Sequence, residues 1–323
     1  MKVLYYLHKT IGVFPHMFPY YKKFGGKVFT TDGETYTRFR NEYPFINITV
    51  DLAEAFKYNA DVVIYGDYVP KFPNSKSVQV FHGIELKGYY AIKKDWNMCE
   101  EYDLCLLYGD KSLNNFKNNG WNPKYKLIGY PRFDNIVPIP FNLFKNDRKT
   151  LLIAPTWSDE SLLKRFHKEI VELSEQYNVI LKIHSLIGTP KDCNKSYMKY
   201  ISENADPTKL VIYNNSDILP FMKQTDLMIT DYSGSSCEYM LVDKPIIIAD
   251  PKQPLEKPDV WDVCVVCEDP KTLKDVVASQ LETDDKKEER NAYFKNLIYQ
   301  EDGSTATERG IRAIEELVEG KND

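Results

Sequence analysis

Short runs of apolar and β-branched residues recur along the whole chain, and they limit its possible folds more than any other feature. In the runs at 61–65 (DVVIY) and 103–108 (DLCLLY), consecutive residues are apolar, so both faces of a strand would be buried. Burial of both faces is typical of parallel sheets that helices cover on either side. Because helical or irregular segments separate the runs, the sequence predicts an α/β protein built on parallel sheets.

The first half of the chain contains six such runs. Strands are predicted at residues 2–7, 27–31, 61–65, 77–81, 103–107 and 125–128. Helices are predicted between them at 51–58 and 111–119, the second of which ends in Asn119-Gly120, a common helix stop. This alternation is that of one α/β domain.

A segment containing Pro138 and Pro140 then interrupts the pattern, and we place a domain boundary within 136–148. The predicted domains are 1–145 and 146–323. The second half gives strands at 150–154, 178–183, 210–213, 227–230, 245–249 and 263–266, and helices at 158–176, 218–224, 236–242, 270–281, 286–299 and 304–319. We therefore expect two doubly wound, Rossmann-like domains, with the carboxyl ends of both sets of strands directed at a central cleft.

Composition narrows the class of protein. A chain of 323 residues with 43% hydrophobic and 28% charged residues has the balance of a soluble globular protein. A net charge of -5 argues against a nucleic-acid partner. The N-terminus lacks the features of a signal peptide, and no apolar run approaches the roughly 18–20 residues that span a bilayer. We expect a cytoplasmic protein, and a local basic patch would still allow contact with the inner face of the membrane.

Cys264 and Cys267 form a C-x-x-C sequence, but their surroundings alternate like a strand. A redox or metal site would need a helix N-terminus or a loop at this place. We therefore interpret both as buried cysteines.

The most specific segment for function is 227–250. Asp231 ends a predicted strand, and the turn that follows leads into a helix. Hydroxyl groups and free N–H groups at such a turn suit phosphate, which makes Ser233, Ser235 and Ser236 candidate ligand contacts, and Glu238 could meet a ligand hydroxyl. The alternative is a helix N-cap formed by Ser235 or Ser236 and supported by Asp231.

Two histidines follow predicted strands, one in each domain. His82 lies in HGIELKG, where an imidazole could remove a proton from a hydroxyl near neutral pH, with Glu85 or Lys87 beside it. His184 follows LKI and could donate a hydrogen bond to a phosphate oxygen. Each is equally well explained, by itself, as a histidine that caps a strand or is satisfied within the core.

Two further segments also follow strands. APTWSDE (154–160) offers the Thr156 hydroxyl, and Trp157 would line a pocket or close the core. GYPRFD (129–134) carries Arg132, whose guanidinium is a good phosphate partner, although a loop arginine is usually solvated.

Several reaction classes are excluded or weakened by missing motifs. The chain has no G-x-x-x-x-G-K-[ST] and no G-x-G-x-x-G after a strand, which argues against P-loop NTPases and dinucleotide oxidoreductases. It has no D-x-D at a strand end, no H-E-x-x-H and no histidines at metal-ligand spacing, so no metal is expected.

Taken in order, HGIELKG, GYPRFD, APTWSD, KIHS and TDYSGSSCEYMLVDKPII resemble the CDP-glycerol glycerophosphotransferase family, the teichoic-acid primases and polymerases and their capsule relatives. The resemblance covers about residues 78–249. It implies a GT-B fold and transfer of a polyol phosphate from CDP-glycerol, CDP-ribitol or a similar donor to a polyol-phosphate or glycan-lipid acceptor, with release of CMP and without a metal ion.

The resemblance also implies roles for single residues. His82 would be the general base on the acceptor, and His184 would bind the donor pyrophosphate. Contacts to phosphate or donor would come from Arg132, Thr156, Ser233, Ser235 and Ser236, while Asp231 and Glu238 would contact the donor hydroxyls or the loop.

The chain departs from the family pattern at Ile84-Glu85, Ser158, Ser185 and Gly234. These changes affect donor, acceptor and membrane attachment more than reaction type. The alternatives are a GT-B glycosyltransferase or UDP-N-acetylglucosamine 2-epimerase-like enzyme that uses a nucleotide sugar, and a scaffold subunit without activity.

Overall fold

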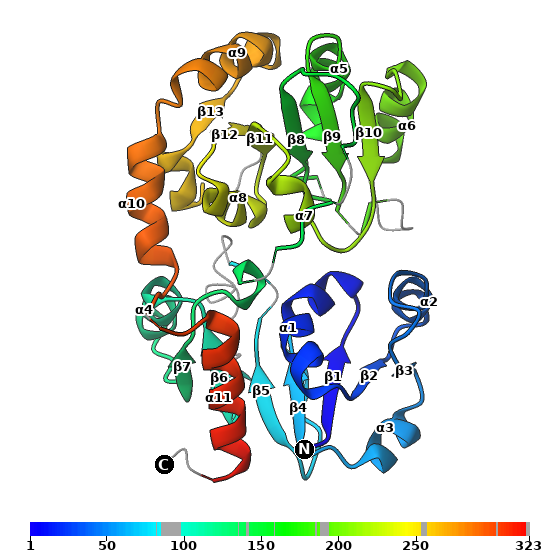
Figure 1. Ribbon diagram of the computed structural model, residues 1–323, viewed down its shortest axis with the longest axis vertical. Coiled ribbons are helices and arrows are strands. Elements are labelled where there is room, and N and C mark those ends of the chain that lie inside the picture. The colour runs from blue at the N-terminus through cyan, green and yellow to red at the C-terminus, as the bar shows by residue number, and fades with distance from the viewer. Residues whose placement is uncertain are drawn as a thin grey trace. The chain divides into compact units, whose positions relative to one another are not determined.

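The computed structural model describes residues 1–81, 83–84, 98–134, 136–139, 142–157, 159–184, 186–187, 194–252, 257–301 and 303–320. It forms two compact units (Figure 1). Unit 1 comprises residues 1–135 and 295–323, and unit 2 comprises residues 136–294. The sequence placed the boundary ten residues later and assigned the whole C-terminal tail to the second domain. The structure instead places the last helix in unit 1.

Unit 1 contains a seven-stranded parallel sheet in the order β3-β2-β1-β4-β5-β6-β7. Its strands are β1 (Val3–Leu7), β2 (Lys27–Thr30), β3 (Ile48–Thr49), β4 (Val62–Tyr65), β5 (Lys76–Gln79), β6 (Leu104–Leu107) and β7 (Tyr125–Leu127). Its helices are α1 (Phe14–Phe24), α2 (Gly33–Glu42), α3 (Leu52–Tyr58), α4 (Asp110–Asn118) and α11 (Ala306–Val318). Six of the strands were predicted, whereas β3, α1 and α2 were not.

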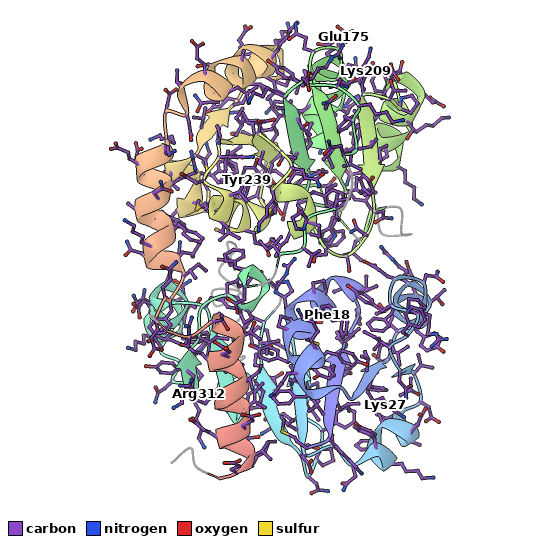
Figure 2. All side chains as sticks on the ribbon, viewed as in Figure 1. Phe18, Lys27, Glu175, Lys209, Tyr239 and Arg312 are labelled. Atoms are coloured by element: carbon purple, nitrogen blue, oxygen red, sulfur yellow. The ribbon has the colours of Figure 1, made fainter. Side chains whose placement is uncertain are left out.

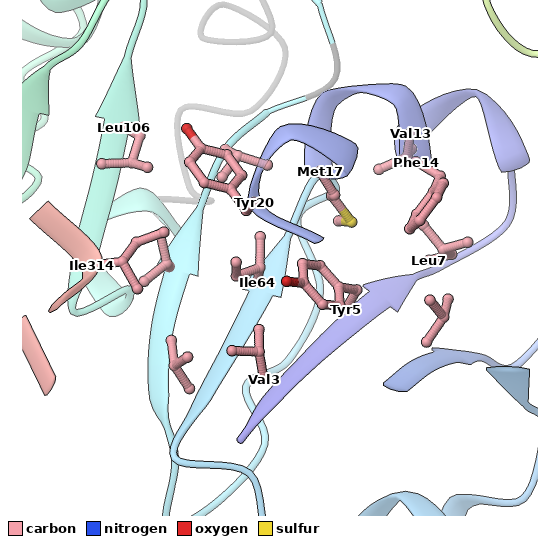
Figure 3. Packing of buried hydrophobic residues seen from close by; sticks show 14 of the residues in the cluster. Val3, Tyr5, Leu7, Val13, Phe14, Met17, Tyr20, Ile64, Leu106 and Ile314 are labelled. Atoms are coloured by element: carbon pink, nitrogen blue, oxygen red, sulfur yellow. The ribbon is translucent and has the colours of Figure 1, made fainter. Parts of the chain in front are cut away.

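The core of unit 1 explains why α11 belongs to it. Figure 3 shows Tyr20 of α1 and Ile314 of α11 beside residues of β1, β4 and β6. α11 packs closely against α1, since a Cβ added to Gly310 would lie 2.5 Å from the Tyr20 hydroxyl. The carboxylate of Asp134 accepts the N–H groups of Ala306 and Thr307, which otherwise lack partners in the first turn of a helix. Apolar burial and capping therefore fix the end of the chain to the first unit.

Unit 2 contains a six-stranded parallel sheet in the order β10-β9-β8-β11-β12-β13. Its strands are β8 (Thr150–Ala154), β9 (Asn178–Lys182), β10 (Leu210–Tyr213), β11 (Leu227–Thr230), β12 (Ile246–Ala249) and β13 (Val265–Cys267). Its helices are α5 (Leu163–Leu173), α6 (Lys195–Asn204), α7 (Leu219–Met222), α8 (Ser235–Tyr239) and α9 (Leu273–Thr283), and α10 (Lys287–Leu297) crosses the division between the units. All six strands were predicted.

The two cysteines of the C-x-x-C sequence lie in the buried interior of unit 2. Burial raises the pKa of the Cys264 thiol to about 12 and also raises the pKa of the Cys267 thiol, as expected for inert cysteines.

Tyr239 of α8 is fully buried, and its hydroxyl lies 3.1 Å from Thr225 Oγ1 (Figure 2). The helix after the serine turn is therefore tied into the core.

Both sheets share one topological property. In each, the strand order runs one way from the first strand and then reverses, so that β1 and β4 in unit 1, and β8 and β11 in unit 2, are neighbours across a topological switch point. In open α/β sheets, ligands bind beside the carboxyl ends of the strands at such a point. Each unit therefore offers one such place.

Candidate functional site

The carboxyl edge of the unit 2 sheet gathers most of the predicted site residues. Thr156 follows β8, His184 follows β9 and Asp231 follows β11, and these three strands are adjacent (Figure 1). The serine turn and Glu238 continue from β11 into α8. Residues far apart in sequence thus lie at one edge because parallel pairing brings the ends of their strands together.

Asp231 holds this edge together. It is completely buried, and its carboxylate accepts the N–H of Thr156 at 3.0 and 3.1 Å and the N–H of Leu162 at 2.8 Å. Hydrogen bonds to an ionised acceptor are the strong ones. Asp231 therefore fixes the loop between β8 and α5, whereas the sequence offered it as a donor-hydroxyl contact or as support for the serine turn.

The serine turn is ordered by its own hydroxyl groups. Ser235 Oγ lies 2.9 Å from Ser233 Oγ, and Ser236 Oγ donates to the Ser233 carbonyl at 2.9 Å. The N-cap of α8 is Gly234, without a side-chain cap, so neither Ser235 nor Ser236 is the cap. The turn follows β11, at whose end the Thr230 hydroxyl donates to the Ala154 carbonyl at 2.7 Å. The hydroxyl groups are thus held in a fixed frame on the strand end.

His184 is partly exposed, and its ring is oriented by the following loop. Its Nδ1 accepts the Leu186 N–H at 3.1 Å, so a neutral ring carries its proton on Nε2. Trp157 stacks on the imidazole with a centroid distance of 6.3 Å, and the Trp157 carbonyl accepts a hydrogen bond from Asn194 at 2.7 Å. The imidazole is thereby oriented to offer an N–H donor.

Arg132 lies in unit 1, in a short 3-10 helix (Pro131–Phe133), and is buried. Its Nη1 donates to His16 Nε2 at 3.2 Å and to the Tyr130 hydroxyl at 3.2 Å. Because a guanidinium only donates, His16 accepts through Nε2 and presents Nδ1–H to Tyr130 at 3.4 Å. Arg132 is thus part of a buried polar cluster, and its contact with a donor phosphate stays a prediction.

His82 lies outside the described residues, as do Glu85, Lys87, Ser158 and Ser185. The turn that leads to His82 is described. Phe81 has a positive φ of 58°, which is unusual for a bulky residue and persists only where the surroundings hold it. The Tyr108 hydroxyl donates to the Val80 carbonyl at 2.6 Å and so holds the preceding residue.

Gln79 was not predicted from the sequence as a residue of the site. It is completely buried at the end of β5; its Oε1 accepts the Phe81 N–H at 2.9 Å, and its Nε2 donates to the Asp67 carbonyl at 3.0 Å. One side chain thus joins the loop after β4 to the strained turn before His82. The available signal was a glutamine within a run (VQVF) that is otherwise buried and apolar.

Within the described ranges, no three His, Cys, Asp or Glu side chains cluster as ligands of one metal ion would. None of the helices in the described part of the chain has the length and apolar content needed to cross a lipid bilayer.

Two Rossmann-type parallel sheets, with polar loops gathered at the carboxyl edge of the second, define a chain of the GT-B fold class. Comparison with solved structures agrees. The wall teichoic acid polymerase TagF matches with a TM-score of 0.68 and 17% identity over 100% of this chain and 90% of that chain. A putative UDP-N-acetylglucosamine 2-epimerase from Listeria monocytogenes matches with a TM-score of 0.66 and 15% identity, over 99% of this chain and 97% of that chain.

The model of the family CDP-Glycerol:Poly(glycerophosphate) glycerophosphotransferase matches residues 47–316, and the chain belongs to this family. Among curated relatives, the teichoic acid glycerol-phosphate primase of Bacillus subtilis is 26% identical over 223 residues, which are 59% of this chain and 55% of the relative. The teichoic acid poly(glycerol phosphate) polymerase of Staphylococcus epidermidis is 24% identical over 216 residues, which are 55% of this chain and 29% of the relative. The matched residues thus cover less than a third of the length of the polymerase and just over half of the length of the primase.

Proposed function

We propose that this chain transfers glycerol phosphate, or a related polyol phosphate, from a CDP-activated donor to an acceptor hydroxyl in teichoic-acid, capsule or other surface-polymer synthesis, with release of CMP. The observation that carries the proposal is the gathering of Thr156, His184 and the serine turn at one edge of the unit 2 sheet. Membership of the family supports the reaction type. A TagF variant was soaked with CDPG, which supports a CDP-linked donor.

In the proposed step, the acceptor oxygen attacks the phosphorus that carries the polyol. A new P–O bond forms, the P–O bond to the CMP phosphate breaks, and CMP leaves with that electron pair. His82 takes the proton of the acceptor hydroxyl, and His184 donates from Nε2 to a phosphate oxygen of the donor. Such a transfer needs mainly positioning and charge stabilisation.

The remaining donor contacts are assigned by their place at the edge. Thr156 and the hydroxyl groups of Ser233, Ser235 and Ser236 face the donor phosphates, and Glu238 completes the set at this edge. Arg132, which lies in unit 1, is assigned to the donor by its sequence motif alone. Asp231 acts on the donor indirectly, because its carboxylate holds the loop that carries Thr156. We infer that the reaction proceeds without a metal ion.

The direct test is release of CMP from CDP-glycerol and CDP-ribitol, with glycerol and short poly(glycerol phosphate) as acceptors, with and without EDTA. The proposal predicts release that depends on acceptor and survives EDTA. Folded protein that releases no CMP with any CDP-polyol would refute it. Substitution of His82 by Ala should lower kcat at least 100-fold and leave donor binding intact; equal loss of donor binding would refute the base role.

A nucleotide-sugar enzyme is the second candidate, favoured by the match to the putative 2-epimerase at a TM-score of 0.66. Thermal unfolding of the chain with UDP-sugars and with CDP-polyols separates the two. Stabilisation by a UDP-sugar alone would favour this candidate, and stabilisation by a CDP-polyol favours the transferase.

We also propose that unit 1 contacts the inner face of the membrane peripherally. Around the edge strand β3, Phe45 is 99% exposed, and Leu52 and Phe56 are about half exposed. Contiguous exposed apolar surface marks interaction sites, and we assign these three side chains to one such surface. Cosedimentation with vesicles of phosphatidylglycerol should fall when Phe45 and Phe56 are replaced by Ser, and unchanged cosedimentation would refute this surface.

A further inference from the structure

The topological switch point of unit 1 carries polar side chains that the proposed reaction does not use. His8 directly follows β1, and Asp67 follows β4 after a single residue, Gly66. The last paired residues of these strands are Tyr6 and Tyr65. The same register continued by two residues sets His8 opposite Asp67, and both side chains are partly exposed.

Two further side chains belong to this place. Tyr6 lies on the same face of β1 as His8, and the two rings meet edge to face with a centroid distance of 6.3 Å. Burial raises the pKa of Tyr6, the Thr31 hydroxyl is near enough to lower it, and the charge of Asp67 acts on both Tyr6 and His8. Phenol, hydroxyl, imidazole and carboxylate therefore share one edge of the sheet.

The backbone around the pair is held by neighbouring strands. The His8 carbonyl accepts from the hydroxyl groups of Thr30 and Thr31 at 3.5 Å, and the Asp67 carbonyl accepts from Gln79 at 3.0 Å. A Cβ at Gly66 would lie 2.2 Å from a methyl group of Val13, so only glycine lets the chain pass here. Side chains on such a fixed frame are preorganised for a ligand.

The His8 ring lacks the partner that a core histidine would have. Its Nδ1 is buried and has no hydrogen-bond partner within the described part of the chain. Burial lowers the pKa of His8, as does Lys9, while Asp67 and Asp32 oppose this. A neutral imidazole has one N–H donor and one acceptor, and a hydroxyl group can pair with either of them.

We propose that His8 and Asp67, with Tyr6 and Thr31, bind the uncharged, hydroxyl-bearing part of the acceptor. The carboxylate accepts from a ligand hydroxyl and repels phosphate, so the subsite selects a neutral polyol or sugar unit. β5 lies beside β4 and ends at Gln79, three residues before His82 in the sequence, so a ligand bound here lies at the edge of the sheet at which β5 also ends. The identity of the ligand as acceptor rests on the proposed function.

The test follows the Cε1–Hε1 NMR signals of the five histidines of the whole chain during titration with glycerol and, separately, with inorganic phosphate. The His8 signal is assigned by its loss in His8→Gln. We expect the His8 signal to shift saturably with glycerol and to stay unchanged with phosphate, while the signal of His167 stays unchanged in both. Asp67→Asn should raise the dissociation constant for glycerol about tenfold, since it removes a charged acceptor; the exposed control Asp147→Asn should leave it unchanged.

A linear shift shared by all histidines, a response of His8 to phosphate, or an Asp67→Asn variant that binds glycerol as well as the wild type would each overturn the proposal. Because this titration measures binding alone, its failure is distinct from failure of the proposed reaction, which is read from CMP release. Retained release of CMP with an unresponsive His8 would refute the subsite only.

Discussion

The two switch points of the molecule use an aspartate in opposite ways. In unit 2, Asp231 is completely buried and its carboxylate holds the N–H groups of Thr156 and Leu162. In unit 1, Asp67 is partly exposed and its backbone carbonyl accepts a hydrogen bond from Gln79, and the register of β1 and β4, continued by two residues, sets Asp67 opposite His8. The same residue type at the same place in the same topology therefore holds backbone N–H groups in one unit and is proposed to bind a ligand in the other. Burial and the atoms that are engaged, more than residue type, decide the role.

The largest expected effect is on catalysis, where His184 of unit 2 and His8 of unit 1 should act on different kinetic constants. Substitution of His184 by Ala should lower kcat/KM for CMP release at least 100-fold, as loss of one donor to a developing charge does elsewhere. His8→Ala should instead raise KM for the acceptor about tenfold with little change in kcat. Steady-state kinetics with donor and acceptor varied in turn measure both. Equal effects of the two variants on the donor KM would remove the division of labour between the switch points.

The two aspartates should differ in stability. Asp231→Ala leaves buried N–H groups unpaired, and we expect the free energy of unfolding to fall by about 3 kcal/mol. Asp67→Ala should cost less than about 1 kcal/mol, because the Asp67 side chain is partly exposed and water can replace its contacts. Urea unfolding of the whole chain, together with hydrogen exchange of the amides of 156–162, checks this. Similar losses for both variants would contradict the comparison.

Gln79 of unit 1 tests whether the turn before His82 must be held in place for catalysis. Gln79→Leu removes both hydrogen bonds between the loop after β4 and the turn before His82, and we expect kcat to fall about tenfold with the donor KM unchanged. Gln79→Glu keeps an acceptor for the Phe81 N–H and should recover part of kcat. A kcat that does not respond to either variant would show that the turn is positioned without this side chain.

The smallest effect concerns the helix that closes unit 1. Thr305 forms a capping box with Glu308 at the start of α11, and Thr305→Ala should lower the free energy of unfolding by about 1 kcal/mol without changing CMP release. Thermal unfolding and the release assay measure the two quantities. A loss of activity as large as that of Gln79→Leu would assign α11 a role in the site.

The strands and their parallel arrangement could be predicted because buried apolar runs are a local property of the sequence. β3 was missed because it has only two residues at the edge of the sheet, and α1 because Pro19 and its many aromatic residues obscure its helical pattern. Tertiary packing stabilises α1, since Phe14, Met17 and Tyr20 are buried in the core. The aromatic residues Phe14 and Tyr20 of α1 thus belong to the core.

The sequence predicted which residues lie at the candidate site better than it predicted what each of them binds. The ends of β8, β9 and β11 could be expected at one edge, because parallel strands end together. That Asp231 binds backbone N–H groups depends on the path of the loop between β8 and α5, which no local pattern specifies. α11 joins unit 1 for the same kind of reason, since the contact between Gly310 and Tyr20 joins residues far apart in sequence.

We propose that the switch point of unit 2 binds the donor and that the switch point of unit 1 binds the acceptor. The most direct measurement is titration of the whole chain with CDP-glycerol while the NMR signals of His184 and His8 are followed separately. We expect CDP-glycerol to shift the His184 signal saturably and to leave the His8 signal unchanged, and we expect glycerol to do the reverse. A donor-induced shift of His8 together with an unchanged His184 would contradict it.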